Sequence, residues 1–126
     1  MKKFILLLLF IASASVNAQS TNECNRFHTG TFKYLDNRFG TITRTETRQR
    51  EVNEKNGNYF DGTIKWLSDC EYEITLEKSN ATGTEEMMGK PIRAAIVAIS
   101  GNVATIQFIA PDGSKGYIKI EKVEIQ

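Results

Sequence analysis

Histidine is almost absent from this chain. Only His28 occurs among 126 residues, whereas hydrolytic triads and many zinc sites need an imidazole as base or ligand. The sequence also has no Gly-rich phosphate loop, zinc-ligand spacing or calcium loop. The neighbouring carboxylates Glu71 and Glu73 are predicted to lie on a solvent-facing surface. We therefore expect a protein that is not an enzyme and that holds no cofactor and no metal.

An excess of positive charge is also lacking. The chain has 16 Lys and Arg against 15 Asp and Glu. Two of the basic residues, Lys2 and Lys3, precede an N-terminal apolar run, so the rest of the chain carries 14 basic and 15 acidic side chains. Nucleic-acid binding needs clustered basic residues that replace the counterions of the phosphates. The charge balance therefore argues against a nucleic-acid partner.

Long apolar runs are limited to one, Phe4–Ala12, at the N-terminus. It follows a basic start and precedes small residues, with Val16 and Ala18 at the −3 and −1 positions of a cleavage site. The run is too short for a membrane-spanning helix, which needs about 20 residues. The pattern predicts a signal peptide over residues 1–18, with cleavage after Ala18. The mature protein is then a single domain over residues 19–126, periplasmic or secreted, with no membrane span.

The chain has two cysteines, Cys24 and Cys70. Cys24 lies six residues beyond Ala18, which is the wrong context for a lipidated cysteine. In an oxidising compartment the two thiols are expected to form a disulfide that closes a loop of 47 residues. Redox pairs usually have the Cys-x-x-Cys spacing instead. A metal site of Cys24, His28 and Cys70 is an alternative, but it offers three ligands at most.

The helical period of 3.6 residues is missing after residue 25. Apolar and polar residues alternate instead, between clusters of Gly, Asn and Asp, which is typical of strands joined by tight turns. Short connections exclude parallel crossovers. We predict an all-β fold, an antiparallel up-and-down meander of about eight strands that closes into a small lipocalin-like barrel; the alternative is a two-sheet β-sandwich. The expected strands cover residues 28–35, 41–46, 48–53, 60–66, 70–76, 92–99, 103–109 and 116–123.

The fourth and fifth expected strands carry the clearest pattern. Between Phe60 and Leu76 the apolar residues stay at even positions through the turn. A loop with an odd number of residues preserves this parity, because the residues that flank it pair on one face. We therefore predict a three-residue turn over residues 67–69, flanked by Trp66 and Cys70.

Several of these segments together resemble a known group of proteins. They are Cys24, Gly30–Tyr34 (GTFKY), Arg44, Gln49, Glu51 and Ile64–Glu73 (IKWLSDCEYE). The chain resembles a family of small exported bacterial proteins described as lipocalin-like (calycin-like) β-barrels, for which no activity is established. It is also similar to lipocalins, whose first strand carries Gly-x-Trp, although Phe32 replaces the tryptophan here. The resemblance implies a small exported barrel and assigns no activity.

The second and third expected strands, residues 41–51, have almost no apolar side chains. In a closed barrel one face must point inward, so Arg44, Arg50 or their neighbours are predicted to reach the interior. A buried Arg either pairs with Glu46 or Glu51 or binds an anionic ligand. Aromatic residues would supply the apolar walls of such a pocket. The predicted ligand-binding residues are Phe32, Tyr34, Arg44, Arg50, Trp66 and Tyr72.

These residues favour an exported, non-enzymatic barrel that binds a small apolar or amphipathic ligand, including an anionic one, in its interior. The alternative is an interaction module with a filled core and no ligand. Such a module would present its surface, or the irregular stretch of residues 79–89, to another envelope protein.

Overall fold

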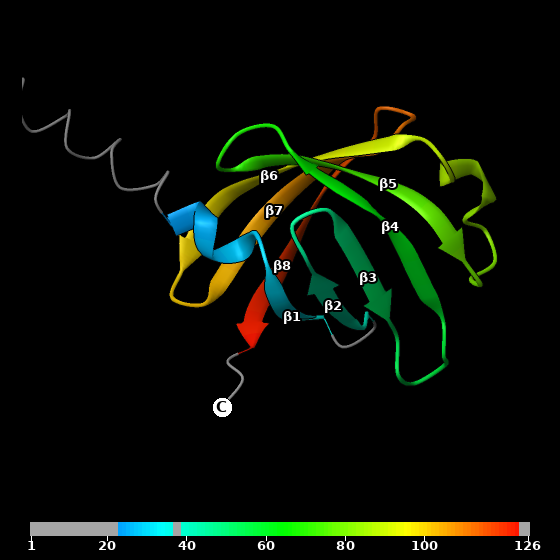
Figure 1. Cartoon of the computed structure of the whole chain (residues 1–126), viewed down its shortest axis with the longest axis horizontal. Coiled ribbons are helices and arrows are strands. Elements are labelled where there is room, and N and C mark those ends of the chain that lie inside the picture. Colours follow the sequence, from blue (N-terminus) through cyan, green and yellow to red (C-terminus); the bar gives the residue numbers. More distant parts are fainter. Residues whose placement is uncertain (1–22, 37–38, 124–126) are drawn as a thin grey trace, which may run out of the picture.

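The computed structural model describes residues 23–36 and 39–123. The predicted signal peptide, residues 1–18, lies outside the described residues. Eight strands and two short 3₁₀ helices follow one another along the chain (Figure 1). They are η1 (Asn25–Phe27), β1 (Gly30–Tyr34), β2 (Thr41–Arg44), β3 (Arg48–Val52), β4 (Tyr59–Trp66), β5 (Glu71–Ser79), η2 (Glu85–Met87), β6 (Pro91–Ser100), β7 (Val103–Ile109) and β8 (Lys115–Val123).

The strands form one closed antiparallel barrel. Each strand pairs with the next in sequence, and β8 pairs with β1, with Thr31 opposite Val123 and Tyr34 opposite Ile120. The predicted up-and-down meander is therefore confirmed, and the two-sheet sandwich is not formed. Closure gives each strand a hydrogen-bonded neighbour on both sides, so the barrel has no edge strand. No helix within residues 23–36 and 39–123 is long and apolar enough to cross a membrane.

The prediction of a three-residue turn between β4 and β5 is wrong. Trp66 lies opposite Tyr72, and the Leu67 N–H donates to the Glu71 carbonyl at 2.8 Å, so five residues separate the paired positions. This number is still odd, and Trp66 and Tyr72 lie on one face. Cys70 lies outside the β4–β5 ladder because it forms a disulfide with Cys24 and its carbonyl accepts the Ile96 N–H at 2.8 Å.

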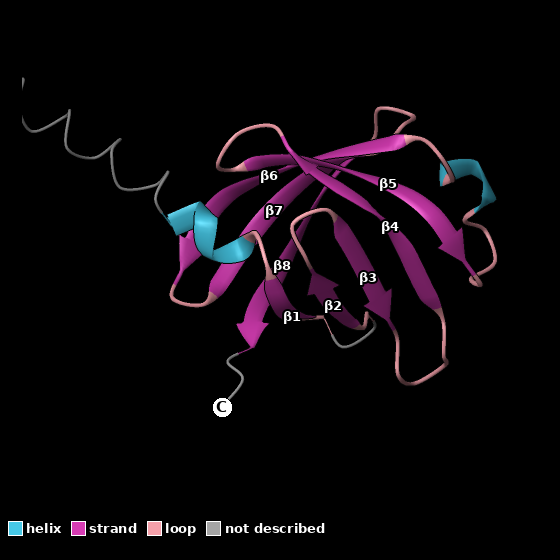
Figure 2. Cartoon of the chain, in the orientation of Figure 1, coloured by secondary structure: helices cyan, strands magenta, loops and turns pink. Residues whose placement is uncertain are grey.

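The two ends of the barrel differ. At one end η1 lies beside the β6–β7 turn, where the Arg26 guanidinium donates to the Gly101 carbonyl at 2.8 Å, and the fully buried Phe27 plugs the barrel. At the opposite end lie the β3–β4 and β7–β8 connections together with η2 (Figure 2). We call the first the η1 end and the second the entrance end.

Candidate functional site

A cavity of about 290 Å³ occupies the barrel interior. All eight strands contribute inward-facing side chains to its wall, and Phe39 and Met87 line it from the entrance end. Phe39 is half exposed, so the cavity reaches that end of the barrel. The apolar part of the wall that the strands supply consists of Ile42, Phe60, Ile74, Leu76, Ile92, Ile106, Phe108, Ile118 and Ile120.

Five polar side chains complete the wall: Tyr34, Arg44, Gln49, Glu51 and Tyr72. We call them the interior polar cluster. Arg44 Nε donates to Gln49 Oε1 at 2.7 Å, and Gln49 Nε2 donates to Glu51 Oε2 at 2.8 Å. The Tyr34 hydroxyl donates to Glu51 Oε1 at 2.6 Å, and Arg44 Nη2 donates to the Tyr72 hydroxyl at 2.9 Å. The cluster therefore links one cation and one carboxyl group through a continuous hydrogen-bond chain.

Arg44 is held entirely by the protein. Its side chain is buried, and its third nitrogen, Nη1, donates to the Phe27 carbonyl of η1 at 2.9 Å. The guanidinium carbon lies 4.7 Å from the ring centre of Tyr72, 5.2 Å from that of Phe32 and 5.8 Å from that of Trp66. Hydrogen bonds from all three nitrogens and cation–π contacts compensate for the cost of burying the charge. The partners of Arg44 are therefore internal, but they are Gln49, Tyr72 and the Phe27 carbonyl and not the expected Glu46 or Glu51.

Burial is the main cause of the pKa shifts in the interior polar cluster. It raises the pKa of the Glu51 carboxyl above its ordinary value of 4.5, although the hydrogen bonds from Tyr34 and Gln49 and the Arg44 charge oppose this shift. Burial and the neighbouring Glu51 raise the pKa of the Tyr34 hydroxyl well above 10.0. Burial also raises the pKa of the Tyr72 hydroxyl. Both tyrosines are therefore neutral hydrogen-bonding groups at physiological pH.

The raised pKa of Glu51 predicts a pH dependence of stability. The native carboxyl binds its proton more tightly than the unfolded one, so its contribution is fully present below pH 4.5 and is lost as pH rises through the higher native pKa. A Glu51→Gln variant should lack this loss. Its free energy of unfolding should therefore increase relative to that of the wild type as pH rises. Urea unfolding of both proteins across this pH range measures the difference. A difference that does not change with pH would contradict the assignment.

The predicted binding residues divide into three groups. Tyr34, Arg44 and Tyr72 line the cavity. Phe32 and Trp66 do not line it and pack toward the η1 end, where Phe32 lies against Phe27 with ring centres 5.9 Å apart. The inward placement of Arg50 is wrong, because its guanidinium lies on the outer surface and pairs with Asp61 there. The N–O distance of that pair is 2.5 Å.

Gln49 and Glu51 line the cavity but were not among the predicted binding residues. Four residues separate the paired Arg44 and Gln49, so both side chains share one face, and Glu51 follows on that face two residues later. Odd positions of β3 therefore point inward, and Arg50 points outward. The length of the β2–β3 turn decides this placement, and it is known from the strand register of the structure.

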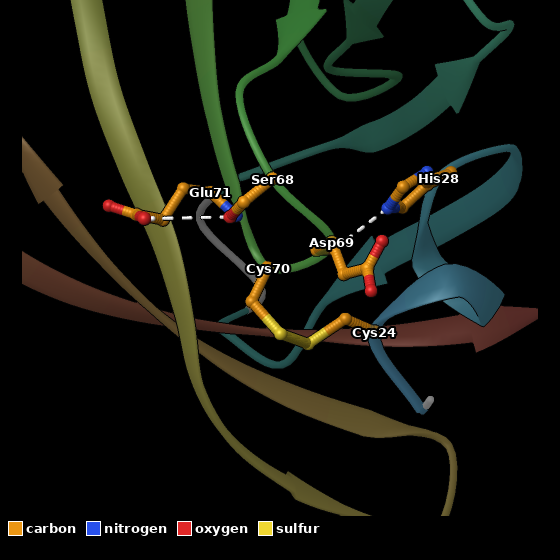
Figure 3. Close-up of a disulfide and its surroundings, with 6 residues drawn as sticks. All are labelled: Cys24, His28, Ser68, Asp69, Cys70 and Glu71. Carbon is orange, nitrogen blue, oxygen red and sulfur yellow. Dashed lines mark hydrogen bonds between the residues drawn. A yellow bond between two sulfur atoms is a disulfide. The ribbon is translucent and has the colours of Figure 1, made fainter. Parts of the chain in front are cut away.

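The disulfide and the lone histidine lie together at the η1 end. Cys24 and Cys70 are bonded, with their Cα atoms 5.2 Å apart, and His28 lies nearby (Figure 3). His28 Nε2 hydrogen-bonds the Asp69 carbonyl at 2.8 Å, and its ring stacks on Trp66 with centres 3.6 Å apart. Because the two sulfurs bond each other, the alternative Cys24/His28/Cys70 metal site does not form. The disulfide indicates an oxidising, non-cytoplasmic environment.

Comparisons with known proteins found no relative. A scan against protein-family models, a search of curated proteins and a search of solved structures gave no match. The closed eight-stranded barrel is consistent with a lipocalin-like fold. The chemistry of the site must therefore be inferred from its own geometry.

Proposed function

We propose that this protein is an exported, non-enzymatic, lipocalin-like binding protein whose barrel holds one small, mainly apolar ligand. The observation that carries the proposal is the interior cavity of about 290 Å³, walled by aliphatic and aromatic side chains with a few polar groups at one side. Ligand sites in proteins have this composition. The N-terminal pattern of residues 1–18 supports export to the periplasm or the exterior.

The size of the cavity limits the ligand. At about 30 Å³ for each water in the liquid, 290 Å³ corresponds to the volume of about ten water molecules. This lies at the lower bound of the roughly 300–1,000 Å³ of drug-sized sites. We therefore propose a ligand of about ten non-hydrogen atoms, such as a medium-length alkyl chain with a small head group.

Filling the cavity is the direct test of the proposal. Ile118 on β8 lines the cavity, whereas its neighbour Tyr117 points outward and is 65% exposed. Ile118→Trp should weaken binding of octan-1-ol more than about tenfold, because each displaced CH₂ group loses about 0.8 kcal/mol. Tyr117→Trp introduces the same side chain on the outer face of the same strand and should leave binding unchanged. Titration calorimetry measures both affinities.

Equal affinity of wild type and Ile118→Trp would place the ligand outside the barrel and reject the proposal. Native mass spectrometry of the same samples separates the alternative. A stable oligomer with no affinity for hexan-1-ol, octan-1-ol or decan-1-ol would favour an interaction module, for which the exposed Leu35, Phe39 and Tyr117 would be the first surface to examine.

The absence of catalysis remains part of the proposal. It is supported by the position of the single imidazole, because His28 does not line the cavity and its Nε2 is engaged by the Asp69 carbonyl. If a hydrolytic activity were detected and removed by His28→Ala in a folded protein, this part of the proposal would be wrong.

A further inference from the structure

The interior polar cluster presents its two charges at different depths. Arg44 lies opposite Gln49, near the η1 end, and Glu51 lies two residues farther along β3 toward the entrance end. Two residues of a strand span about 6.6 Å. A ligand that enters the barrel therefore meets the Glu51 carboxyl before the Arg44 guanidinium.

Arg44 has little to offer a ligand. Three of its five N–H donors are used by Gln49, the Tyr72 hydroxyl and the Phe27 carbonyl, and its side chain is buried near the η1 end. Within residues 23–36 and 39–123, the one buried side-chain nitrogen or oxygen without a hydrogen-bond partner is Trp66 Nε1, which does not line the cavity. A ligand carboxylate would have to displace hydrogen bonds that Arg44 already makes.

Glu51, in contrast, retains capacity to accept. Its two oxygens take one hydrogen bond each, from Tyr34 and from Gln49. Both neighbours donate to the carboxyl group, as they would to an ionised carboxylate, which offers about four lone-pair sites, so about two remain. Glu51 is partly exposed and lines the cavity, so these sites can be reached from the ligand side. A donor that meets them makes a charge-assisted hydrogen bond, whereas a second carboxylate meets a like charge.

We infer that the cavity selects ligands whose polar end donates a hydrogen bond, alcohols and alkylammonium ions, over ligands that end in a carboxylate. This inference rests on the proposed function and narrows it. It disfavours one option left open by the arginines of residues 41–51, an anionic ligand. The specificity comes from the position of Glu51 nearer the entrance end and from the burial of Arg44, each of whose three nitrogens already donates to a protein acceptor.

Three probes of equal chain length test the inference: octan-1-ol, octylammonium and octanoate. Titration calorimetry at about pH 8 keeps the amine protonated, since alkylammonium groups such as that of Lys have a pKa near 10.4. Octan-1-ol and octylammonium should each bind the wild type about tenfold or more tightly than octanoate, because hydrogen bonds to charged groups are strong and like charges repel. This order is measured on the wild-type protein and does not depend on any variant.

A variant then assigns the preference to Glu51. Glu51→Gln keeps the side-chain shape and removes the charge, so octylammonium should weaken about tenfold and its advantage over octanoate should shrink. Glu121→Gln makes the same change on the exposed outer face of β8 and should alter neither affinity. Thermal unfolding monitored by circular dichroism confirms that both variants are folded.

The outcomes separate this inference from the proposed function. Octanoate binding as tightly as octan-1-ol, with both blocked by Ile118→Trp, would overturn the donor preference and leave the binding function intact. An unchanged preference in folded Glu51→Gln would also overturn the inference. If none of the three probes binds, the proposed function itself fails.

Discussion

Replacing Arg44 with methionine is expected to lower the free energy of unfolding by about 3–5 kcal/mol. Methionine keeps much of the apolar stem but removes a buried cation whose nitrogens hold Gln49, Tyr72 and the Phe27 carbonyl. The acceptors then lose their donors inside the protein, and Glu51 loses the opposite charge of its cluster. Breaking one side of a buried charge network has this large cost because the remaining polar groups stay buried. Urea unfolding of both proteins measures the difference.

Arg50→Met is the matched control. It makes the same substitution on the adjacent strand, but Arg50 is half exposed and pairs with Asp61 on the surface. Surface ion pairs contribute about 0.2–1 kcal/mol, so Arg50→Met should cost no more than that. Equal costs for the two variants would mean that the interior polar cluster does not exist in solution.

A second substitution tests how much of the cost of losing Arg44 comes from the Glu51 carboxyl that remains buried. In the Arg44→Met/Glu51→Gln double variant the carboxyl that remained without a cation is also neutralised. The double variant should therefore be more stable than the sum of the single effects, with a coupling of about 0.5–3 kcal/mol. Additive effects would show that the Gln49 amide insulates the two charges from each other.

The alternating pattern of the sequence predicted the antiparallel meander and favoured its closure into a barrel over a two-sheet sandwich. Short connections between strands allow only antiparallel neighbours, and an apolar inner face can be covered by closure. The Cys24–Cys70 bond was predicted on a different ground, since two cysteines in an oxidising compartment allow only one pairing. The strand pattern depends on local residue order, which the sequence displays directly.

Features that depend on turn length were predicted less accurately. One residue more or less in the β2–β3 turn exchanges the inner and outer faces of β3, and this decides whether Arg50 or Glu51 lines the cavity. The sequence of residues 45–47 does not fix that length. For the same reason Trp66 was expected to pair with Cys70, whereas it pairs with Tyr72.

The alternating pattern also did not predict at which end of the barrel each aromatic side chain lies. Phe32 and Trp66 pack toward the η1 end because η1 plugs the barrel there and brings Phe27 and His28 against them. A 3₁₀ helix of three residues is too short to show any periodicity. The division between filled and open interior depends on contacts between strands that are distant in sequence, so the cavity could not be located from the sequence alone.

Removing the disulfide should be the other large perturbation. A Cys24→Ala/Cys70→Ala variant is expected to lose about 4 kcal/mol of stability, since the bond closes a loop of 47 residues and restricts the unfolded chain. This is a large part of the roughly 5–15 kcal/mol typical of a folded domain. Urea unfolding with and without a thiol reductant provides the comparison. Reductant should destabilise the wild type and leave the variant unchanged.

The disulfide and Arg44 also act on the same segment. Cys24 is the residue that precedes η1, and the Phe27 carbonyl at the end of η1 accepts the hydrogen bond from Arg44 Nη1. Once the disulfide is absent, η1 is held less firmly, so Arg44 has less of this bond to lose. Combining Arg44→Met with the alanine pair should therefore cost less than the two separate losses together, by about 0.5 kcal/mol or more. Fully additive losses would mean that η1 stays docked on the barrel without its covalent link.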